Sequence, residues 1–221
     1  MSGARYVAII TDGNGRWATQ RGLPVLEGHR AGADVVKARL RDAAELGIDE
    51  LTVYSFSTEN WSRSPEEVAG LMAMFSERIL RETPELHEEG VRMRFIGRRQ
   101  GVASDLLEQM RWAEETTAAN ERITLYVAFN YGGRAEILDA ARAFTGSTEA
   151  EFRARLYAPE MHDPDLLIRT SGEQRLSNYL MWQSAYSELH FTEVLWPDFS
   201  RADLEFALAE FDARKRRFGG R

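Results

Sequence analysis

The stretch Tyr6-Val7-Ala8-Ile9-Ile10-Thr11-Asp12-Gly13-Asn14-Gly15-Arg16-Trp17 decides the fold, because it places a short apolar run directly before a glycine-rich polar turn. The apolar run is typical of a β-strand inside a sheet. The two glycines of the turn let the backbone approach an oxygen-rich ligand, and a helix after the turn would point its free N–H groups at that ligand. The stretch therefore predicts a strand, a candidate site and a helix, in that order.

Strand-like and helix-like runs alternate along the rest of the chain. Further strands are expected at Glu50–Phe56, Val91–Ile96, Ile123–Phe129, Asp165–Arg169 and Tyr179–Trp182. Helices are expected at Ala31–Leu46, Pro65–Glu89, Ala103–Ala119, Arg134–Phe144 and Ala202–Arg217. This alternation predicts an α/β fold, a single domain over residues 1–221 with a central, mostly parallel sheet of about six strands and helices on both faces. Ligands of such sheets bind at the carboxyl ends of strands, so we expect the polar turns after several strands to meet along one rim.

The composition excludes several classes of protein. The 221 residues contain no cysteine, which excludes a disulfide framework, a thiolate metal site and a cysteine nucleophile. The net charge of −7 argues against a nucleic-acid binder, which requires a basic face. The sequence shows no signal peptide and no apolar run long enough to span a bilayer, so a cytoplasmic location without a membrane span is expected.

The turn after the first strand is the first candidate site. Asp12 could hold Mg²⁺, and Arg16 could pair with a phosphate oxygen. An equally strong interpretation is a tight turn in which Asp12 caps the following helix and Trp17 belongs to the core. The glycine spacing differs from the dinucleotide-binding fingerprint, and the turn lacks the Lys-Ser/Thr pair of a P-loop.

Two further polar segments are weaker candidates. In Gly28–Ala33, at the start of a helix, His29 could donate to a phosphate or carry a proton. A histidine in a first helical turn is more often simply exposed. The segment Ser55–Arg63 ends the second strand with hydroxyl and amide groups that suit hydrogen bonding to a diphosphate. Its alternative role is to lead into the next helix, with Ser64 as the cap.

The fourth candidate segment, Pro164–Phe199, contains a short polar loop between two apolar runs. Arg169, Arg175 and Ser177 in this loop make a plausible diphosphate clamp. Glu188 follows among apolar residues, where burying an unpaired carboxylate would be costly. A metal ion or an arginine partner would remove that cost, so Glu188 is either a second acidic group of the site or a salt-bridged structural acid.

Taken in order, these motifs closely resemble those of the cis-prenyltransferases, the family of undecaprenyl diphosphate synthase and the shorter Z-isoprenoid synthases. The matching motifs are D-G-N-G-R-W, G-H-R-A-G-A, S-x-E-N-W, N-Y-G-G-R and I-R-T-S-G-E-Q-R-L-S-N, and the resemblance extends over residues 7–220. It implies a magnesium-dependent enzyme that joins short isoprenoid diphosphates. It also implies a homodimer with an apolar tunnel between helices and sheet for the growing chain.

The resemblance assigns roles to individual residues. Asp12 would carry the Mg²⁺ that bridges the allylic diphosphate, and Glu188 would assist the metal near the dimer interface. Asp12, His29 and Asn60 would be catalytic, with Asn60 close to the proton that must leave. The allylic diphosphate would be held around Gly13, Asn14, Gly15, Arg16 and Trp17. The remaining substrate-binding candidates are Ser57, Arg63, Arg169, Arg175, Ser177, and Arg217 with Gly219 reaching the partner subunit's site.

Several departures from the family pattern point to an atypical member that makes a short product. Val25 stands where an arginine usually grips the allylic diphosphate, and Gln174 stands where histidine is frequent. Phe129 replaces a small residue and could either block the tunnel or pack in the core. The first hypothesis is a short-chain synthase that uses isopentenyl diphosphate. The second is a head-to-middle condensation of two allylic diphosphates, and the third is a non-catalytic scaffold subunit, which retention of the Asp12 motif argues against.

Overall fold

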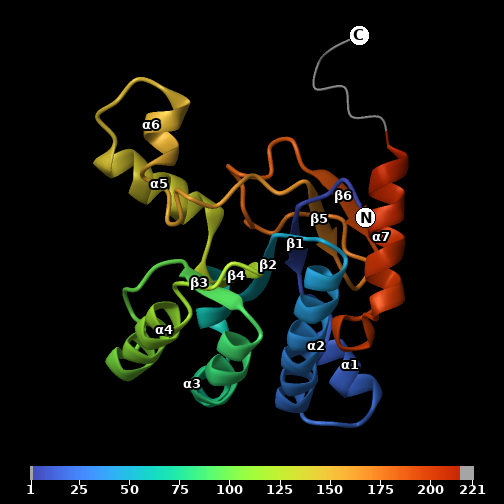
Figure 1. Ribbon diagram of the computed structural model, residues 1–221. Coiled ribbons are helices and arrows are strands. Elements are labelled where there is room, and N and C mark those ends of the chain that lie inside the picture. The colour runs from blue at the N-terminus through green and yellow to red at the C-terminus, as the bar shows by residue number, and fades with distance from the viewer. Residues whose placement is uncertain (1, 215–221) are drawn as a thin grey trace.

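A fully parallel β-sheet forms the centre of the molecule (Figure 1). The computed structural model describes residues 2–214. The strands are β1 (Tyr6–Ile10), β2 (Glu50–Ser57), β3 (Val91–Ile96), β4 (Ile123–Tyr131), β5 (Leu166–Arg169) and β6 (Glu188–Phe191). They follow the spatial order β3-β4-β2-β1-β5-β6, and all neighbouring pairs are parallel. The predicted α/β fold with a central sheet of about six strands is confirmed.

Helices connect these strands. They are α1 (Asn14–Gln20), α2 (Val25–Glu45), α3 (Pro65–Glu88), α4 (Ser104–Thr116), α5 (Gly133–Ala143), α6 (Glu149–Arg153) and α7 (Arg201–Ala213), with 3₁₀ turns η1 (Thr58–Ser62) and η2 (Trp196–Asp198). The α2 helix starts at Val25, earlier than expected, because Pro24 precedes its first turn with a fixed φ and the glycines that follow obscure the helical pattern. None of the helices within residues 2–214 has the length and apolar character needed to cross a lipid bilayer.

One predicted strand is wrong. Residues 179–182 form a turn, and the last strand of the sheet lies further on, at Glu188–Phe191. Leu180 has φ 43°, a left-handed conformation that a strand does not accommodate. The apolar side chains of Tyr179 and Leu180, which suggested a strand, are fully buried in the core instead.

The two faces of the sheet carry separate cores. Side chains alternate between faces along each strand, so Val7 and Ile9 of β1 belong to one core and Tyr6 and Ala8 to the other. The first core lies under α2, α3, α4 and α7, and Figure 1 shows these helices on one side of the strands. The second core is closed by α5 and by irregular segments around residues 157–161 and 176–180.

Glycines fix the turn between β1 and α1. Gly13 has φ 109°, and a Cβ there would lie 3.0 Å from Leu195 Cδ2. A Cβ on Gly28 would lie 2.1 Å from the Asn14 carbonyl oxygen, so only glycine lets α2 pack this closely on the start of α1. The turn is therefore pressed between α2 and the segment before η2, with its open side toward the carboxyl end of β1.

Candidate active site

A cleft of about 710 Å³ opens where β1, β2 and β5 end. The position agrees with the rim predicted for the polar turns. Most of the predicted site residues line this cleft: Asp12, Gly13, Asn14, Gly15, Arg16, His29, Ser57, Asn60, Arg63, Arg169 and Ser177. The parallel sheet thus brings together segments that lie far apart in the sequence.

Asp12 and Arg169 form an ion pair at the base of the cleft. β5 lies beside β1 with Arg169 opposite Ile10, so its guanidinium reaches the turn that follows β1. Arg169 Nη2 donates to Asp12 Oδ2 at 2.9 Å, and Nη1 donates to Ser177 Oγ at 2.6 Å and to the Arg175 carbonyl oxygen. The Arg169 side chain is only 4% exposed, whereas that of Asp12 is 32% exposed. Arg169 is therefore fixed within the protein, while the Asp12 carboxylate is accessible from the cleft.

Arg16 joins the first turn to the loop after β5. Its Nη1 donates to the Ser171 carbonyl oxygen at 2.9 Å and its Nη2 to Ser171 Oγ at 2.5 Å. Nη2 also lies 3.7 Å from Asp12 Oδ2. The N-cap of α1 is Gly13, so the alternative in which Asp12 caps this helix is wrong. Its carboxylate faces two guanidinium groups instead.

His29 lies in the second turn of α2, because the helix begins at Val25. Its side chain is 14% exposed, so the alternative of an exposed histidine is wrong. Arg63 Nη1 lies 3.3 Å from His29 Nε2 and donates to Glu67 Oε1 at 2.9 Å. Burial and then the Arg63 charge lower the pKa of His29 to about 4, although Glu67 acts in the opposite direction. The imidazole is therefore neutral at neutral pH.

The buried neutral imidazole makes stability depend on pH. The pKa of His29 is about 4 in the folded chain against 6.5 ordinarily, so between these values the unfolded state binds more protons and folding is weakened as the pH falls. Between pH 7.5 and 4.5, we expect the wild type to lose about 2–3 kcal/mol more free energy of unfolding than His29→Gln. Urea unfolding of both proteins at the two pH values measures this difference. Equal losses of free energy of unfolding in the two proteins would contradict a lowered pKa of His29 in the folded state.

Ser57 and Asn60 cap the start of the short helix η1. The Ser57 N–H donates to Asn60 Oδ1 at 3.0 Å, and the Ser57 hydroxyl accepts from the backbone of Asn60, which makes a capping box. Ser64 caps α3 as expected, with its Oγ accepting from Glu67 N at 3.2 Å. Capping is therefore a real role of this segment, and the same Ser57 and Asn60 side chains line the cleft.

An apolar pocket of about 110 Å³ continues from the cleft between α2, α3 and the first face of the sheet. Thr11, Asn14, His29 and Ser55 line both spaces. The pocket lies where the tunnel was expected. Phe129 does not block it: the ring is buried and packs against Phe56 and Phe75, with centroid distances of 5.4 and 4.7 Å.

Comparison with known proteins decides the family. The family model described as "Putative undecaprenyl diphosphate synthase" matches residues 10–219. The chain belongs to this prenyltransferase family.

Named relatives and solved structures agree with the assignment. An isoprenyl transferase of Thermotoga maritima is 51% identical, with 98% of this chain and 97% of the relative covered. Lavandulyl diphosphate synthase from Lavandula x intermedia, solved with dimethylallyl diphosphate, superposes with a TM-score of 0.94 at 36% identity over 98% of each chain. A probable undecaprenyl diphosphate synthase from Campylobacter jejuni gives a TM-score of 0.85 at 27% identity over 99% of this chain and 100% of the other.

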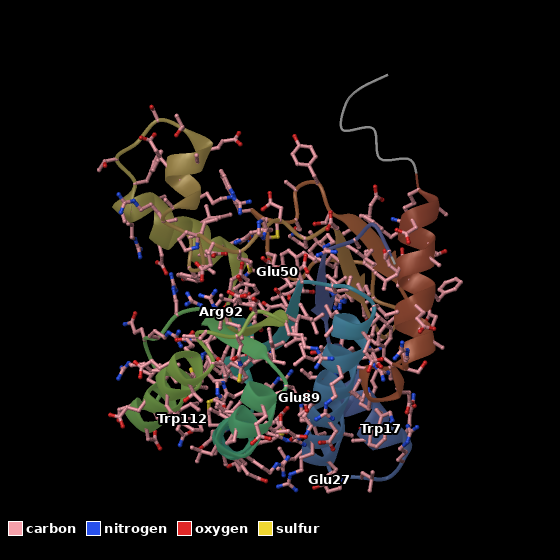
Figure 2. The ribbon with its side chains drawn as sticks, viewed as in Figure 1. Trp17, Glu27, Glu50, Glu89, Arg92 and Trp112 are labelled. Carbon is pink, nitrogen blue, oxygen red and sulfur yellow. The ribbon has the colours of Figure 1, made fainter. Side chains whose placement is uncertain are left out.

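Two residues expected in this prenyltransferase site lie outside the cleft. Trp17 is on the outer side of α1 (Figure 2), where its Nε1 donates to Asp198 Oδ1 at 2.7 Å and the Arg21 guanidinium covers its ring at 4.2 Å. The Arg175 side chain is 60% exposed and pairs with Glu173. Only the backbone carbonyl of Arg175 takes part in the clamp, as an acceptor for Arg169.

Glu188 also lies away from the cleft within this chain. It begins β6 opposite Leu166, at the amino end of β5, whereas Asp12 follows the carboxyl end of β1. Its Oε2 accepts from Arg214 Nη1 at 2.8 Å, which is the arginine partner that the salt-bridge alternative requires. Arg217 and Gly219 lie outside the described residues.

The sequence prediction gave no individual role to several residues that line the cleft: Thr11, Tyr54, Ser55, Glu59, Glu67 and Asn178. The pairing of Glu67 was predictable from the sequence, because Glu67 lies four positions after Arg63, the spacing at which an acid and a base on a helix can pair. Asn178 donates to Glu59 Oε1 at 2.8 Å. Burial acts to raise the pKa of Glu59. Hydrogen bonds to its carboxylate, of which the one from Asn178 has the largest effect, outweigh burial and bring the pKa below its ordinary value. The cleft therefore holds an ionised Glu59 as well as arginines.

The donor set fits Mg²⁺ that arrives with a diphosphate. Within residues 2–214 there is no group of three or more His, Asp or Glu side chains arranged to hold a metal ion by themselves. Mg²⁺ does not require one, since it is commonly held by one or two carboxylates together with water and substrate phosphates. Both contacts of Asp12 with arginine use Oδ2, so neither guanidinium engages Oδ1.

Proposed function

We propose that this prenyltransferase condenses a short allylic diphosphate, such as dimethylallyl or geranyl diphosphate, with isopentenyl diphosphate and releases inorganic diphosphate. The observation that carries the proposal is the juxtaposition of two environments. The cleft presents Asp12 beside Arg16 and Arg169, and an apolar pocket continues from it past His29. A diphosphate with a hydrocarbon tail matches both parts at once.

The residues of the cleft divide the binding task. The Gly13–Arg16 turn offers backbone N–H groups and a guanidinium to the allylic diphosphate. Arg169 with Ser177 takes the second diphosphate. Asp12 would hold Mg²⁺, which when bound would help neutralise the charge of the leaving diphosphate. Glu188, Arg217 and Gly219 enter this proposal only through a homodimer, in which they would complete the site of the partner subunit.

The proposed reaction breaks one bond and forms another. The allylic C–O bond ionises, and its electron pair leaves with the diphosphate, whose charge the arginines stabilise. The double bond of isopentenyl diphosphate attacks the allylic cation, and a proton is lost to form the new double bond. Asn60 lies in the wall beside this step. A diphosphate close to His29 opposes the effect of Arg63 and raises the pKa of the imidazole, which makes it a better proton acceptor.

A second candidate reaction joins two allylic diphosphates head to middle. The likeness to lavandulyl diphosphate synthase favours it, as does Val25, which lines the cleft at the position where the resemblance leads one to expect an arginine. Without that guanidinium, one wall of the allylic site is apolar. A branched or shifted second allylic substrate could lie against it.

Product analysis separates the two reactions. Purified protein receives Mg²⁺ with dimethylallyl diphosphate alone, with isopentenyl diphosphate alone, or with both, and matched samples contain EDTA. We expect product and released diphosphate only with both substrates and with Mg²⁺. Product from dimethylallyl diphosphate alone would replace the first reaction by the second. No turnover with any pair, including geranyl diphosphate, would refute both and return the chain to a scaffold role.

A further inference from the structure

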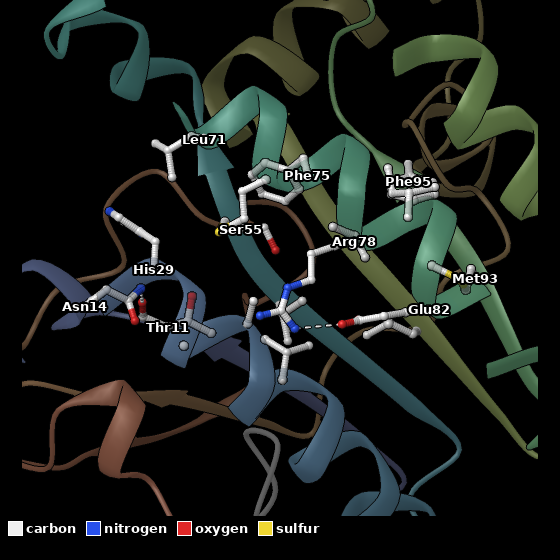
Figure 3. A pocket seen from close by; sticks show the side chains of 18 of the residues that line it. Thr11, Asn14, His29, Ser55, Leu71, Phe75, Arg78, Glu82, Met93 and Phe95 are labelled. Carbon is white, nitrogen blue, oxygen red and sulfur yellow. Dashed lines mark hydrogen bonds and ion pairs between the residues drawn. The ribbon is translucent and has the colours of Figure 1, made fainter. Parts of the chain in front are cut away.

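A largely buried ion pair lies in the wall of the apolar pocket. Arg78, on α3, donates from Nη1 to Glu82 Oε1 at 2.7 Å, one turn along the same helix. The side chains of both residues are 13% exposed, and both line the pocket together with Leu71, Met74, Phe75 and Met93. Figure 3 shows the pair facing into a space that the apolar side chains of Leu71, Phe75, Met93 and Phe95 also border.

The same guanidinium joins α3 to α2. Arg78 Nη1 also donates to Asp34 Oδ1 at 2.5 Å, and Nη2 donates to the Arg30 carbonyl oxygen at 3.0 Å. Both partners belong to α2, the helix that forms the opposite wall of the pocket. The bridge therefore spans the gap between the two helices, while His29 and Asn14 lie toward the cleft.

The burial of these charges calls for a role other than stability. A buried ion pair is often no more stabilising than apolar side chains of the same volume, which would also suit an apolar wall better. The neighbouring pair Glu77–Arg81 on α3 is 60% and 55% exposed, as an ordinary surface pair is. Arg78 and Glu82 instead place charge in the wall of the pocket, beside which a hydrocarbon chain would lie.

The volume of the pocket agrees with a limit on the length of the hydrocarbon chain near this ion pair. Its volume of about 110 Å³ is somewhat smaller than the roughly 150 Å³ cavity known to accommodate benzene. That leaves room for about one five-carbon unit beyond the cleft. A longer chain would have to displace the guanidinium from two carboxylates and leave charge unpaired against hydrocarbon.

We propose that the bridge formed by Arg78, Glu82 and Asp34 ends the apolar pocket and sets the length of the hydrocarbon product. Arg78 and Glu82 are thus specificity-determining residues, distant from the diphosphate groups. This inference rests on the proposed prenyl transfer, because product length has meaning only if the chain elongates an isoprenoid.

The test compares product lengths from the same substrates. Arg78→Ala/Glu82→Ala removes both pocket-lining charges at once, and the partners that they leave behind, Asp34 and Arg81, are 68% and 55% exposed and therefore hydrated. We expect the ratio of products longer by one or more five-carbon units to the wild-type product to rise at least about tenfold, since even one methylene changes selectivity tenfold or more in an apolar pocket. Mass spectrometry of the dephosphorylated products measures it. Lys37→Ala/Glu85→Ala removes another ion pair between α2 and α3, whose residues do not line the pocket, and is the matched control, expected to keep the wild-type length.

A second double variant keeps the inference testable if the first does not fold. Arg78→Val/Glu82→Val also removes both charges but keeps more apolar bulk than alanine, and it should also lengthen the product, whereas Arg78→Leu/Glu82→Leu fills the space and should not. A folded, active alanine or valine variant with the wild-type product distribution would overturn the inference, as would equal lengthening in the Lys37/Glu85 control. Absence of any condensation by the wild-type protein would instead refute the proposed function.

Discussion

Asp12→Ala is expected to lower kcat for the condensation by about 10²- to 10³-fold, the loss typical when a group that stabilises developing charge is removed. Without this carboxylate, the protein loses its proposed anchor for Mg²⁺ on the allylic diphosphate. Arg16 and Arg169 would still attract the substrate, so the loss should fall on turnover more than on binding. Steady-state rates of diphosphate release, recorded over a range of substrate concentrations, give both kcat and KM.

Asp12→Asn separates charge from geometry. The amide keeps the shape of the side chain and an acceptor for Arg169 Nη2, which donates to Asp12 at 2.9 Å, but it binds Mg²⁺ poorly. We expect its kcat to be nearly as low as that of the alanine variant, with an unchanged circular dichroism spectrum. Asp198→Ala removes another arginine-paired aspartate, which lies in η2 outside the cleft and pairs with Arg21, and it should keep wild-type turnover. Near wild-type rates in Asp12→Asn would refute the metal assignment.

The rim of the cleft was predictable because each of its parts is locally encoded. The runs that become β1, β2 and β5 are short, apolar and followed by polar turns, and the carboxyl ends of parallel strands lie at one edge of a sheet. Sequence pattern alone therefore placed Asp12 and Arg169 on one rim, although 157 positions separate them.

The errors of prediction arise where tertiary packing overrides the local pattern. Tyr179 and Leu180 look like strand residues but fill the second core from a turn. His29 looked exposed because the start of its helix was misplaced by the glycines that α1 requires for close packing. The burial of Arg78 and Glu82 was equally hidden, since a charged pair one helical turn apart normally marks a solvated face.

Arg169→Ala should mainly weaken binding of the second substrate. The truncation of one partner in a buried, hydrogen-bonded charge pair costs about 2–5 kcal/mol, so KM for isopentenyl diphosphate is expected to rise by about 30-fold or more. Arg169→Lys should recover little, because an ammonium group cannot donate to Asp12, Ser177 and a carbonyl in the geometry of the guanidinium fork. KM for each substrate, measured at saturation with the other, distinguishes this effect from a general loss of activity.

Arg175→Ala is the matched control. It tests whether the Arg175 side chain belongs to the clamp, as the sequence predicts, or lies outside it, as the structure indicates. The sequence treats Arg169 and Arg175 as equal members of a clamp, but the structure buries the first and leaves the second side chain 60% exposed beside Glu173. Arg169 holds the loop through the Arg175 backbone, which alanine retains. Arg175→Ala should therefore change KM for isopentenyl diphosphate only slightly. Equal effects of the two variants would mean that the loop closes on the substrate and brings Arg175 into the cleft, whereas an unchanged KM in Arg169→Ala would refute the clamp.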